Sequence, residues 1–418
     1  MAATRALTIF AEIDPDRRRE LDDRLHTIAL DLDGNGVFRP GQVPDTHFMR
    51  FAILDDDRGE LPALLAWEVN HDGDEAAYLA AVARETPGID AVFACCVGYP
   101  GIRQLPAWSA WLRARRHRAA AFYTAYPGVS HREVVNDLAV HAAIRELADT
   151  RRDTLAPLPH HEIQRQLRDA VAARDLETSE IADEGWLARR ALAIVAGVIL
   201  LPALLVIIVP WFVILRARER AEASTPATRP VHARLEVRER EDKIRQNQLT
   251  HVVDLKRGRF RMFTVWSVLH VIGVLASVFY VNGHLGGITS IHFARWVIVR
   301  DRRPVSRSQR RDRLVFFSNY DGSWESYLGE FIDRASTGLT AIWSNTEGFP
   351  QAKMLMFEGA KDEEAFKQWT RDHQRETQVW WSGVPEATVQ NVRDDLWLRR
   401  RLDQTLDREE MAAWLRRV

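Results

Sequence analysis

Histidine, arginine and aspartate recur in the same order at two distant places in the chain. The first set is His47, Arg50 and Asp72, and the second is His292, Arg295 and Asp321. An imidazole can bind a metal ion or a haem iron, and an arginine on the distal side can donate hydrogen bonds to a bound ligand. The second set, together with Asn319, therefore forms our candidate catalytic group, with His292 as a metal or haem ligand and Arg295 as the distal donor.

A purely structural role for the same residues is the alternative. Residues three apart in a strand point to opposite faces, so neither histidine can form a side-by-side pair with the arginine that follows it. Buried polar groups need partners. We therefore also expect Arg50 to pair with Asp72, and Arg295 with Asp321, to fix the turn before a helix. Asn70 and Asn319 would close that turn. His47, Arg50, Asn70 and Asp72 are predicted to be structural.

The recurrence extends well beyond these residues and indicates an internal duplication. His47-Phe48-Met49-Arg50 matches His292-Phe293-Ala294-Arg295, Asn70-His71-Asp72-Gly73 matches Asn319-Tyr320-Asp321-Gly322, and Gly98-Tyr99-Pro100 matches Gly348-Phe349-Pro350. A later pair of segments, 121–123 and 378–381, also matches, so each repeated unit has a tail.

Hydrophobic periodicity predicts the order βαββαβ in the first copy, which is the ferredoxin-like α+β unit. The predicted strands are 6–13, 47–54, 61–69 and 89–96, and the predicted helices begin at Asp14 and Asp72. In the second copy the strands are 249–254, 292–299, 313–318 and 339–345, and a helix covers 323–335. The apolar segment 257–281 takes the place of the first helix, although it could also be a transmembrane span.

Segment 191–215 carries no charged residue and has arginines on both sides. About 20 apolar residues are enough to span a bilayer, so membrane insertion is expected. Two paired units must lie on one side of the membrane. Either the segment is a re-entrant hairpin bent at Pro202 and Pro210, or 257–281 crosses back; we favour the hairpin. We expect the bacterial inner membrane, with both units on its cytoplasmic face and helix 257–281 in the interface.

These features divide the chain into five parts. They are a first unit with a helical tail (1–150), a helical linker (151–188), a membrane segment (189–217), a charged linker (218–248) and a second unit with an apolar first helix and a helical tail (249–418).

Composition and missing motifs exclude several functions. The net charge of -1 does not suggest nucleic-acid binding. Adjacent Cys95 and Cys96 favour a reducing compartment over a disulfide. The sequence has no phosphate-binding glycine loop, zinc-ligand spacing or HExxH motif, and no metal site is predicted. One difference between the copies stands out: segment 94–97 is Ala-Cys-Cys-Val, whereas 344–347 is Ser-Asn-Thr-Glu, which is typical either of a pocket kept in one copy or of drift at an exposed end.

The segments HFARWVIV and FFSNYDGSWESYLGEFIDRASTGLTAIWSNTEGFP resemble a family of uncharacterised bacterial membrane-associated proteins. More distantly, the tandem units resemble the dimeric α+β barrel superfamily, which includes dye-decolourising haem peroxidases and chlorite dismutases. The peroxidases carry a Gly-x-x-Asp-Gly motif. Here Ser318 and Val69 replace its first glycine, so the match is partial. The resemblance implies a possible haem, which His292, Trp324 and Glu347 would bind.

Two functions follow from this reading of an α+β protein with two tandem ferredoxin-like units and a membrane-inserted segment between them. In the first, a cavity between the sheet and helices of the second unit binds a small apolar ligand, haem or lipid, and the resemblance to the peroxidases adds peroxidase-like chemistry. In the second, the protein is a non-catalytic, membrane-tethered module whose exposed strands or tryptophan-rich tail bind a protein partner.

Overall fold

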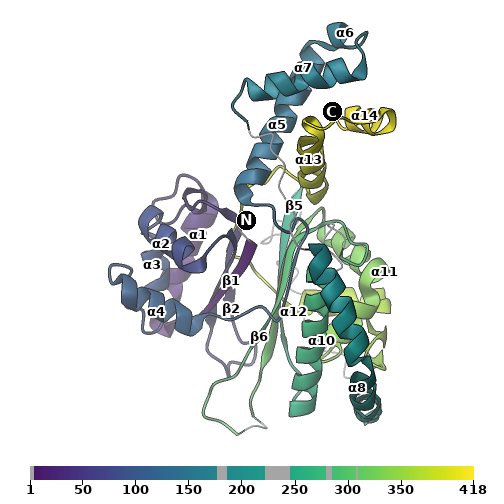
Figure 1. The fold of residues 1–418 in the computed structure, drawn as a ribbon. Helices are drawn as coiled ribbons and strands as arrows, with labels where there is room; N and C mark the ends of the chain where they lie inside the picture. Colours follow the sequence, from purple (N-terminus) through teal and green to yellow (C-terminus); the bar gives the residue numbers. More distant parts are fainter. Residues whose placement is uncertain (1–3, 177–185, 222–244, 279–284, 307–308) are drawn as a thin grey trace.

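Two antiparallel sheets pack face to face, and helices cover the outer face of each (Figure 1). The computed structural model describes residues 4–176, 186–221, 245–278, 285–306 and 309–418. It is a mixed α+β structure, as predicted. The linker expected at 218–248 lies mostly outside the described residues, as do parts of segments 151–188 and 257–281.

The first half of the chain forms one sheet and its helices. Its elements are β1 (Thr4–Glu12), α1 (Arg18–Leu30), β2 (Thr46–Leu54), β3 (Leu64–Asp72), α2 (Glu75–Glu85), α3 (Ile89–Phe93) and α4 (Leu105–Arg115). Helices α1 to α4 pack on the outer face of the sheet around a core that includes Leu25, Trp67, Phe93 and Trp108.

The second half forms the other sheet. Its elements are β5 (Gln246–Asp254), α10 (Arg259–Val278), β6 (Ile291–Val299), β7 (Arg313–Asp321), α11 (Trp324–Trp343), the short strands β8 (Ala352–Lys353) and β9 (Phe357–Glu358), α12 (Glu363–His373) and β10 (Gln374–Arg375). Helices α10, α11 and α12 cover its outer face around Leu269, Trp296, Phe316 and Trp343.

Each sheet is completed by a strand from the other half of the chain. β4 (Ala121–Thr124) follows the first half but pairs with β6, and β11 (Val379–Ser382) follows the second half but pairs with β2. The resulting strand orders are β1-β3-β2-β11 and β10-β5-β7-β6-β4. The two halves therefore exchange edge strands.

The tails that follow these exchanged strands meet in a helical lobe at the top of Figure 1. It contains α5 (His131–Thr150), α6 (Arg152–Leu155), α7 (His160–Ala172), α13 (Val389–Leu402) and α14 (Arg408–Leu415). Helices α5 and α13 pack against each other around Val140, Ile144, Leu398 and Trp414. One tail from each half is thus needed to form the core of this lobe.

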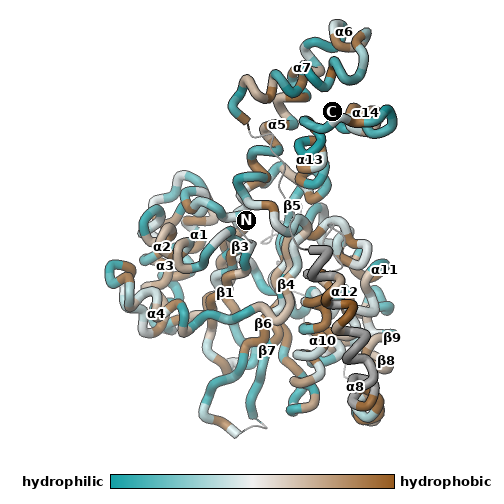
Figure 2. Tube along the Cα trace, in the orientation of Figure 1, coloured by the Kyte–Doolittle hydropathy of each residue, from teal (hydrophilic) through white to brown (hydrophobic). Residues whose placement is uncertain are grey.

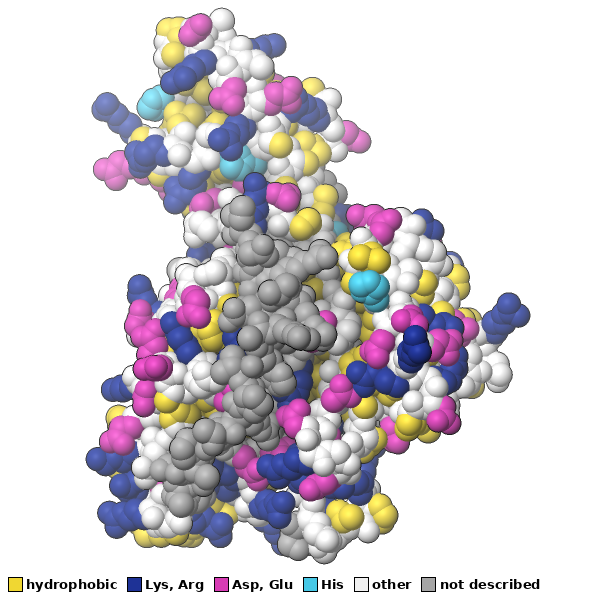
Figure 3. Space-filling model, turned by 180° about the vertical axis from the view of Figure 1, so that it is seen from behind, with side chains coloured by type: hydrophobic (Ala, Val, Ile, Leu, Met, Phe, Trp, Pro, Cys, Tyr) yellow, Lys and Arg dark blue, Asp and Glu magenta, His cyan; other side chains and the backbone are white. Residues whose placement is uncertain are grey.

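The layer between the sheets is apolar near one end of the strands and polar near the other. The apolar part includes Phe10, Leu54, Val252, Val299 and Phe317, all less than a tenth exposed. β2 and β6 carry a register irregularity at the same relative place, between Thr46 and Phe48 and between Ile291 and Phe293. On the surface, acidic and basic side chains are mixed over the face shown in Figure 3.

Two of the predicted strands are wrong. Segment 89–96 begins with the helix α3, and segment 339–345 lies at the end of α11; only isolated bridges, Ile13 to Cys96 and Leu255 to Thr346, join these regions to the sheets. The apolar residues Ile89, Val92 and Phe93 are spaced three and four apart, which is a helical pattern. Segment 339–345 is buried at every position, and segment 89–96 is apolar except for Asp90, so neither shows the alternation of a half-buried strand.

The predicted hairpin at Pro202 and Pro210 is also wrong, because α8 (Trp186–Ala221) continues through both prolines as one helix. α10 lies against β4, as α1 lies against β11, which is the place predicted for an apolar first helix. Among the described residues, one stretch, Arg259–Ala276 of α10, is long and apolar enough to cross a membrane, and 28% of it is buried.

Candidate functional site

Arg50 on β2 and Arg295 on β6 share one buried carboxylate between the sheets, that of Glu68 on β3. The two arginines are 0% and 1% exposed. Nε of Arg50 lies 2.8 Å from Oε2 of Glu68, and Nη2 of Arg295 lies 2.7 Å from Oε1. Burial lowers the pKa of Arg295 to about 10; Glu68 opposes this shift and Arg50 adds to it. The predicted pairs of these arginines with Asp72 and Asp321 are therefore wrong.

Each arginine also ties its own half of the chain to the other half. Arg50 donates to the main-chain oxygens of Leu249 and Ser318, both at 2.8 Å, and to the side-chain oxygen of Asn319. Arg295 donates to the main-chain oxygens of Leu7 and Val69, at 2.8 and 2.9 Å, and to the side-chain oxygen of Asn70. The asparagines thus accept from arginines of the opposite sheet, and the turns they were predicted to close are capped by Asp74 and Ser323.

The predicted histidines bind the aspartates instead. Nε2 of His47 lies 2.9 Å from Asp72, and Nε2 of His292 lies 2.8 Å from Asp321. The second oxygen of each aspartate accepts the N–H of the first residue of a tail helix, at 2.6 Å for α5 and 2.7 Å for α13. A carboxylate is favoured at a helix N-terminus. These pairs therefore anchor the helical lobe to the sheets.

The surroundings of His292 do not fit a haem. The side chain is 0% exposed, its Nε2 is held by Asp321, and its Nδ1 lies 3.0 Å from the hydroxyl of Tyr126. Of the other candidate ligands, Trp324 stacks under the guanidinium of Arg371 at 3.7 Å, and Glu347 lies elsewhere, in a charged pocket. Of the four candidate catalytic residues, His292 and Asp321 contact each other. Arg295 contacts Glu68 and Asn319 contacts Arg50, so the four do not form one site.

The apolar cavity predicted between the sheet and the helices of the second half is present but small. It is lined by residues such as His251, Phe331, Trp343 and Trp369 and has a volume of about 20 Å³. A drug-sized ligand needs about 300–1,000 Å³, whereas one water needs about 10–15 Å³. Neither ring nitrogen of His251 has a partner among the described residues, and burial lowers its pKa well below the usual value. This cavity accommodates a single water.

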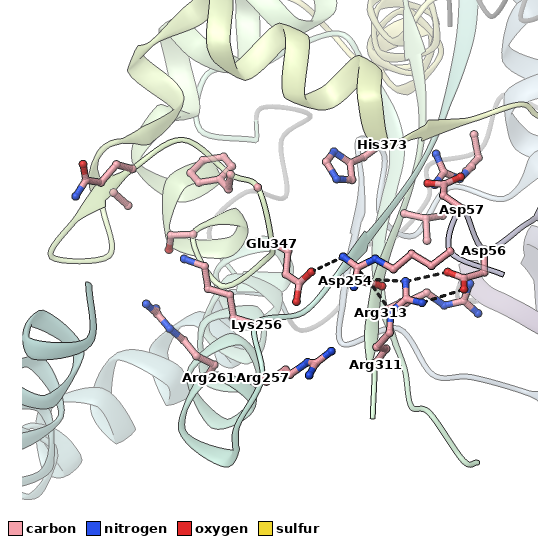
Figure 4. A pocket seen from close by; sticks show the side chains of 18 of the residues that line it. Asp56, Asp57, Asp254, Lys256, Arg257, Arg261, Arg311, Arg313, Glu347 and His373 are labelled. Carbon is pink, nitrogen blue, oxygen red and sulfur yellow. Dashed lines mark hydrogen bonds and ion pairs between the residues drawn. The ribbon is translucent and has the colours of Figure 1, made fainter. Parts of the chain in front are cut away.

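A larger pocket lies between the loop joining β2 to β3, the ends of β5 and β7, and the start of α10 (Figure 4). Its volume is about 680 Å³, and seven basic and six acidic side chains line it. Figure 4 shows Lys256, Arg257 and Arg261 on one side of the pocket and Arg311 and Arg313 on the other. Charge of both signs from distant segments converges here, so we take this charged pocket as the candidate functional site.

Most of the acidic groups are held by arginines. Arg311 lies 2.8 Å from Asp56 and 2.7 Å from Asp254, and Arg58 lies 2.9 Å from Glu347. Burial opposes the ionisation of Asp56, but hydrogen bonds from Arg311 and two main-chain N–H groups lower its pKa to about 2. The Asp56 carboxylate is therefore ionised at neutral pH. Arg311 binds carboxylates of both halves, Asp56 and Asp254, and so joins the two halves.

Of the site residues predicted from sequence, Glu347 alone lines the charged pocket. Its basic residues were missed because they come from separate segments with no common motif. One signal was present: Ser344 and Glu347 belong to the segment that is polar in the second half and apolar in the first. That difference marks a pocket-lining segment.

Comparison of the chain with protein-family models, with curated proteins and with solved structures finds no match.

Proposed function

We propose that this chain is a membrane-attached binding module, held at the lipid surface by α8 and α10, with its charged pocket at the polar end of these helices. The observation that carries this proposal is the exposed apolar face of α10. The proposed function corresponds to the second of the two functions inferred from the sequence. It requires no catalysis by the buried histidine and arginine residues.

Figure 2 shows that much of α10 is hydrophobic. One side of the helix is buried on the sheet, and apolar side chains on the other side are exposed. Val265 and Leu269 are 0% exposed, whereas Phe263, Trp266 and Val271 are 52%, 50% and 58% exposed. Single exposed apolar residues are ordinary, but a stripe of this kind along a helix marks an interaction surface. An amphipathic tryptophan is favoured where lipid meets water.

α8 extends the apolar surface. It runs antiparallel to α10, because Trp211 bonds Thr264 at 3.1 Å while Arg218, further along α8, lies over Phe260, nearer the start of α10. Val206, Val209 and Val213 of α8 are 74%, 59% and 66% exposed. Two neighbouring helices with outward apolar side chains suit a lipid phase better than water.

Basic side chains at one end of the helix pair favour contact with anionic lipid headgroups. Arg216, Arg218 and Arg220 lie near the end of α8. At the same end of the helix pair, Arg259 begins α10 and Arg257 lies two residues before it. Basic residues beside a membrane segment are attracted by anionic lipids. Arginines flank both ends of segment 191–215, so these charges favour attachment to an anionic surface and not one orientation.

Membrane fractionation of the full-length protein tests the proposal. We expect the wild type to remain with the membranes after a high-salt wash and to be released by detergent, because apolar burial does not depend on salt. Replacing Val206, Val209 and Val213 together by Asp should move most of the protein to the soluble fraction.

The matched control makes the same type of change on a helix of the first half. Leu30 on α1 is 66% exposed, so Leu30→Asp adds one carboxylate away from the proposed lipid surface and is compared with Val209→Asp alone as well as with the triple variant. This variant should fractionate as the wild type does. Recovery of the wild type in the soluble fraction, with its fold intact by circular dichroism, would overturn the proposal.

We further propose that the two halves are duplicated ferredoxin-like units that exchange their tail strands. The matching positions of the strand irregularities, of the two histidine–aspartate pairs and of the crossing arginines support this origin. Each half departs from the ferredoxin-like order at its last strand, where a helix and one bridge stand instead.

A further inference from the structure

We propose that the charged pocket binds a phosphate group, held by Arg313, the hydroxyl of Ser344 and the N-terminus of α10. The ligand class is a phosphate monoester or inorganic phosphate. This inference goes beyond membrane attachment and does not depend on it.

Arg313 is a buried cation in the pocket wall without a partner. It is 6% exposed, and no hydrogen bond or ion pair joins its guanidinium to another described residue. The nearby carboxylates of Asp56 and Asp254 are bound by Arg311. Burial lowers the pKa of Arg313, while these two carboxylates act in the opposite direction. A buried charge without a contacting counter-ion is costly, and a bound anion would remove that cost.

Ser344, at the end of α11, is a second polar group in the pocket wall without a partner. The residue is 3% exposed, and its hydroxyl oxygen makes no hydrogen bond to any part of the chain that the structure describes. Buried hydroxyl groups nearly always have a partner. A phosphate oxygen accepts hydrogen bonds from a hydroxyl group as well as from a guanidinium.

The start of α10 lacks the anion that a helix N-terminus favours. Its first turn has no acidic residue and carries Arg259 and Arg261, directly after Lys256 and Arg257. These positive charges are unfavourable beside the positive end of the helix dipole, and a bound phosphate makes the same arrangement favourable. Gly258, with φ of 107°, takes the left-handed conformation that turns the chain into the helix.

A neighbouring cleft is the competing location. It has a volume of about 510 Å³, is lined by Arg115 and His117, and shares Arg311 and Arg313 with the charged pocket. Arg115, however, is already stacked on Trp111 at 4.1 Å and bonded to the main-chain oxygen of Val97. Ser344 and the start of α10 line only the charged pocket, so we assign the phosphate to that pocket.

The test is calorimetric titration of the full-length protein, in neutral detergent, with inorganic phosphate and with chloride at equal ionic strength. Phosphate should bind saturably and chloride should not. Arg313→Leu should weaken phosphate binding about tenfold or more, because a charge-assisted hydrogen bond contributes about 1.5–3 kcal/mol.

Two matched variants keep the test valid if Arg313→Leu does not fold. Arg257→Gln and Arg259→Gln each remove one exposed charge near the start of α10, but only Arg257 lines the pocket. Arg257→Gln and Ser344→Ala should weaken phosphate binding several-fold, and Arg259→Gln and Arg115→Gln should change it by less than about twofold. Absence of saturable phosphate binding, or equal weakening by all four variants, would overturn the proposal.

Competition identifies the source of the phosphate group. Vesicles of phosphatidic acid in phosphatidylcholine should displace bound phosphate if the ligand is a lipid headgroup, whereas pure phosphatidylcholine vesicles should not. Phosphate binding without displacement would support a soluble phosphate compound as the ligand. Both results are independent of membrane attachment, because the fractionation experiment measures attachment without phosphate.

Discussion

The two halves of the molecule share a framework and differ at one end of it. At matched positions the first half has Asp14, Leu64 and Ala94 where the second has Lys256, Arg313 and Ser344. The first helix of the first half buries Leu21, Leu25 and Ile28 and is mostly polar elsewhere, whereas α10 is apolar on both sides. The differences named here are gathered at one end of an otherwise matched framework, where the second half contributes residues to the charged pocket.

The framework itself contains one asymmetry. Glu68 in the first half is matched by Phe317 in the second, so a single carboxylate serves the two crossing arginines. Arg50, Arg295 and Glu68 hold the halves together, whereas residues such as Arg313 and Ser344 make the halves different. Substitutions can test each group.

The largest effect is expected at Glu68. Glu68→Leu leaves Arg50 and Arg295 buried without a counter-charge, and we expect the free energy of unfolding to fall by about 3–5 kcal/mol. Urea denaturation followed by tryptophan fluorescence measures it. Glu60→Gln, which removes a half-exposed partner of Arg311, should cost less than about 1 kcal/mol. Equal costs for the two variants would show that the buried cluster is not what joins the halves.

The second effect concerns pH. Burial lowers the pKa of His71 from 6.5 to about 4, opposed by Asp72, so the folded state binds fewer protons than the unfolded state within that window. The contribution of the neutral His71 side chain to the free energy of unfolding is complete above pH 6.5 and declines as the pH falls toward 4.

The matched residue of the second half is Tyr320, which stacks on Tyr327 as His71 stacks on Tyr78. When the pH is lowered from 6.5 to 5, we expect the free energy of unfolding of His71→Tyr to rise by about 1.6 kcal/mol relative to that of the wild type. Urea denaturation at the two pH values measures this gain. A constant stability difference between the two proteins would refute the titration of His71.

A smaller effect is expected at Tyr126, whose hydroxyl contacts Nδ1 of His292. In the other half, Val384 takes the place of Tyr126, and Nδ1 of His47 has no partner among the described residues. Tyr126→Phe should lower the free energy of unfolding by about 1–2 kcal/mol, because it leaves a buried imidazole nitrogen unpaired. Tyr123→Phe is the control, since that buried hydroxyl has no partner in the described chain. A larger loss for the control would contradict the prediction.

The smallest effect is expected in the exchanged strands. Trp380 on β11 donates from Nε1 to Asn319 at 2.9 Å, and Phe122 stands at the matched position on β4. Trp380→Phe places phenylalanine on β11, as on β4. It should lower the free energy of unfolding by about 1 kcal/mol, the net contribution of one hydrogen bond. Thermal unfolding of this variant beside Asn319→Ala and the double variant measures the coupling; independent effects would exclude a contribution of this bond.

Local patterns in the sequence were sufficient for much of the framework. The β-branched segments at β2 and β6, the Asp-Gly turns and the matched landmarks predict strands and helices close to those observed. The error at 89–96 arose because a βαββαβ template requires a strand there, although Ile89, Val92 and Phe93 have helical spacing.

The strand exchange and the charged pocket could not be predicted in the same way. Strands of four residues, such as β4 and β11, carry no information on which edge they join, because that depends on contacts with the opposite half. Arg50 and Arg295 were expected to bind nearby aspartates, whereas their partners lie across the sheet interface. The pocket combines Asp56, Asp254 and Arg313 from separate segments, and charged residues of this kind are usually solvated.

The exchanged strands also impose an order in time on the synthesis of the chain. The main-chain N–H of Ile53, at the open edge of β2, donates to the side chain of Gln378, 325 residues further along. At about 5–20 residues per second, a ribosome needs roughly 15–65 s to produce that partner. During this interval the β2 edge of the nascent first half is unpaired, and such edges are sites of aggregation. The β2 edge therefore stays open to other chains until β11, in the last tenth of the protein, has emerged.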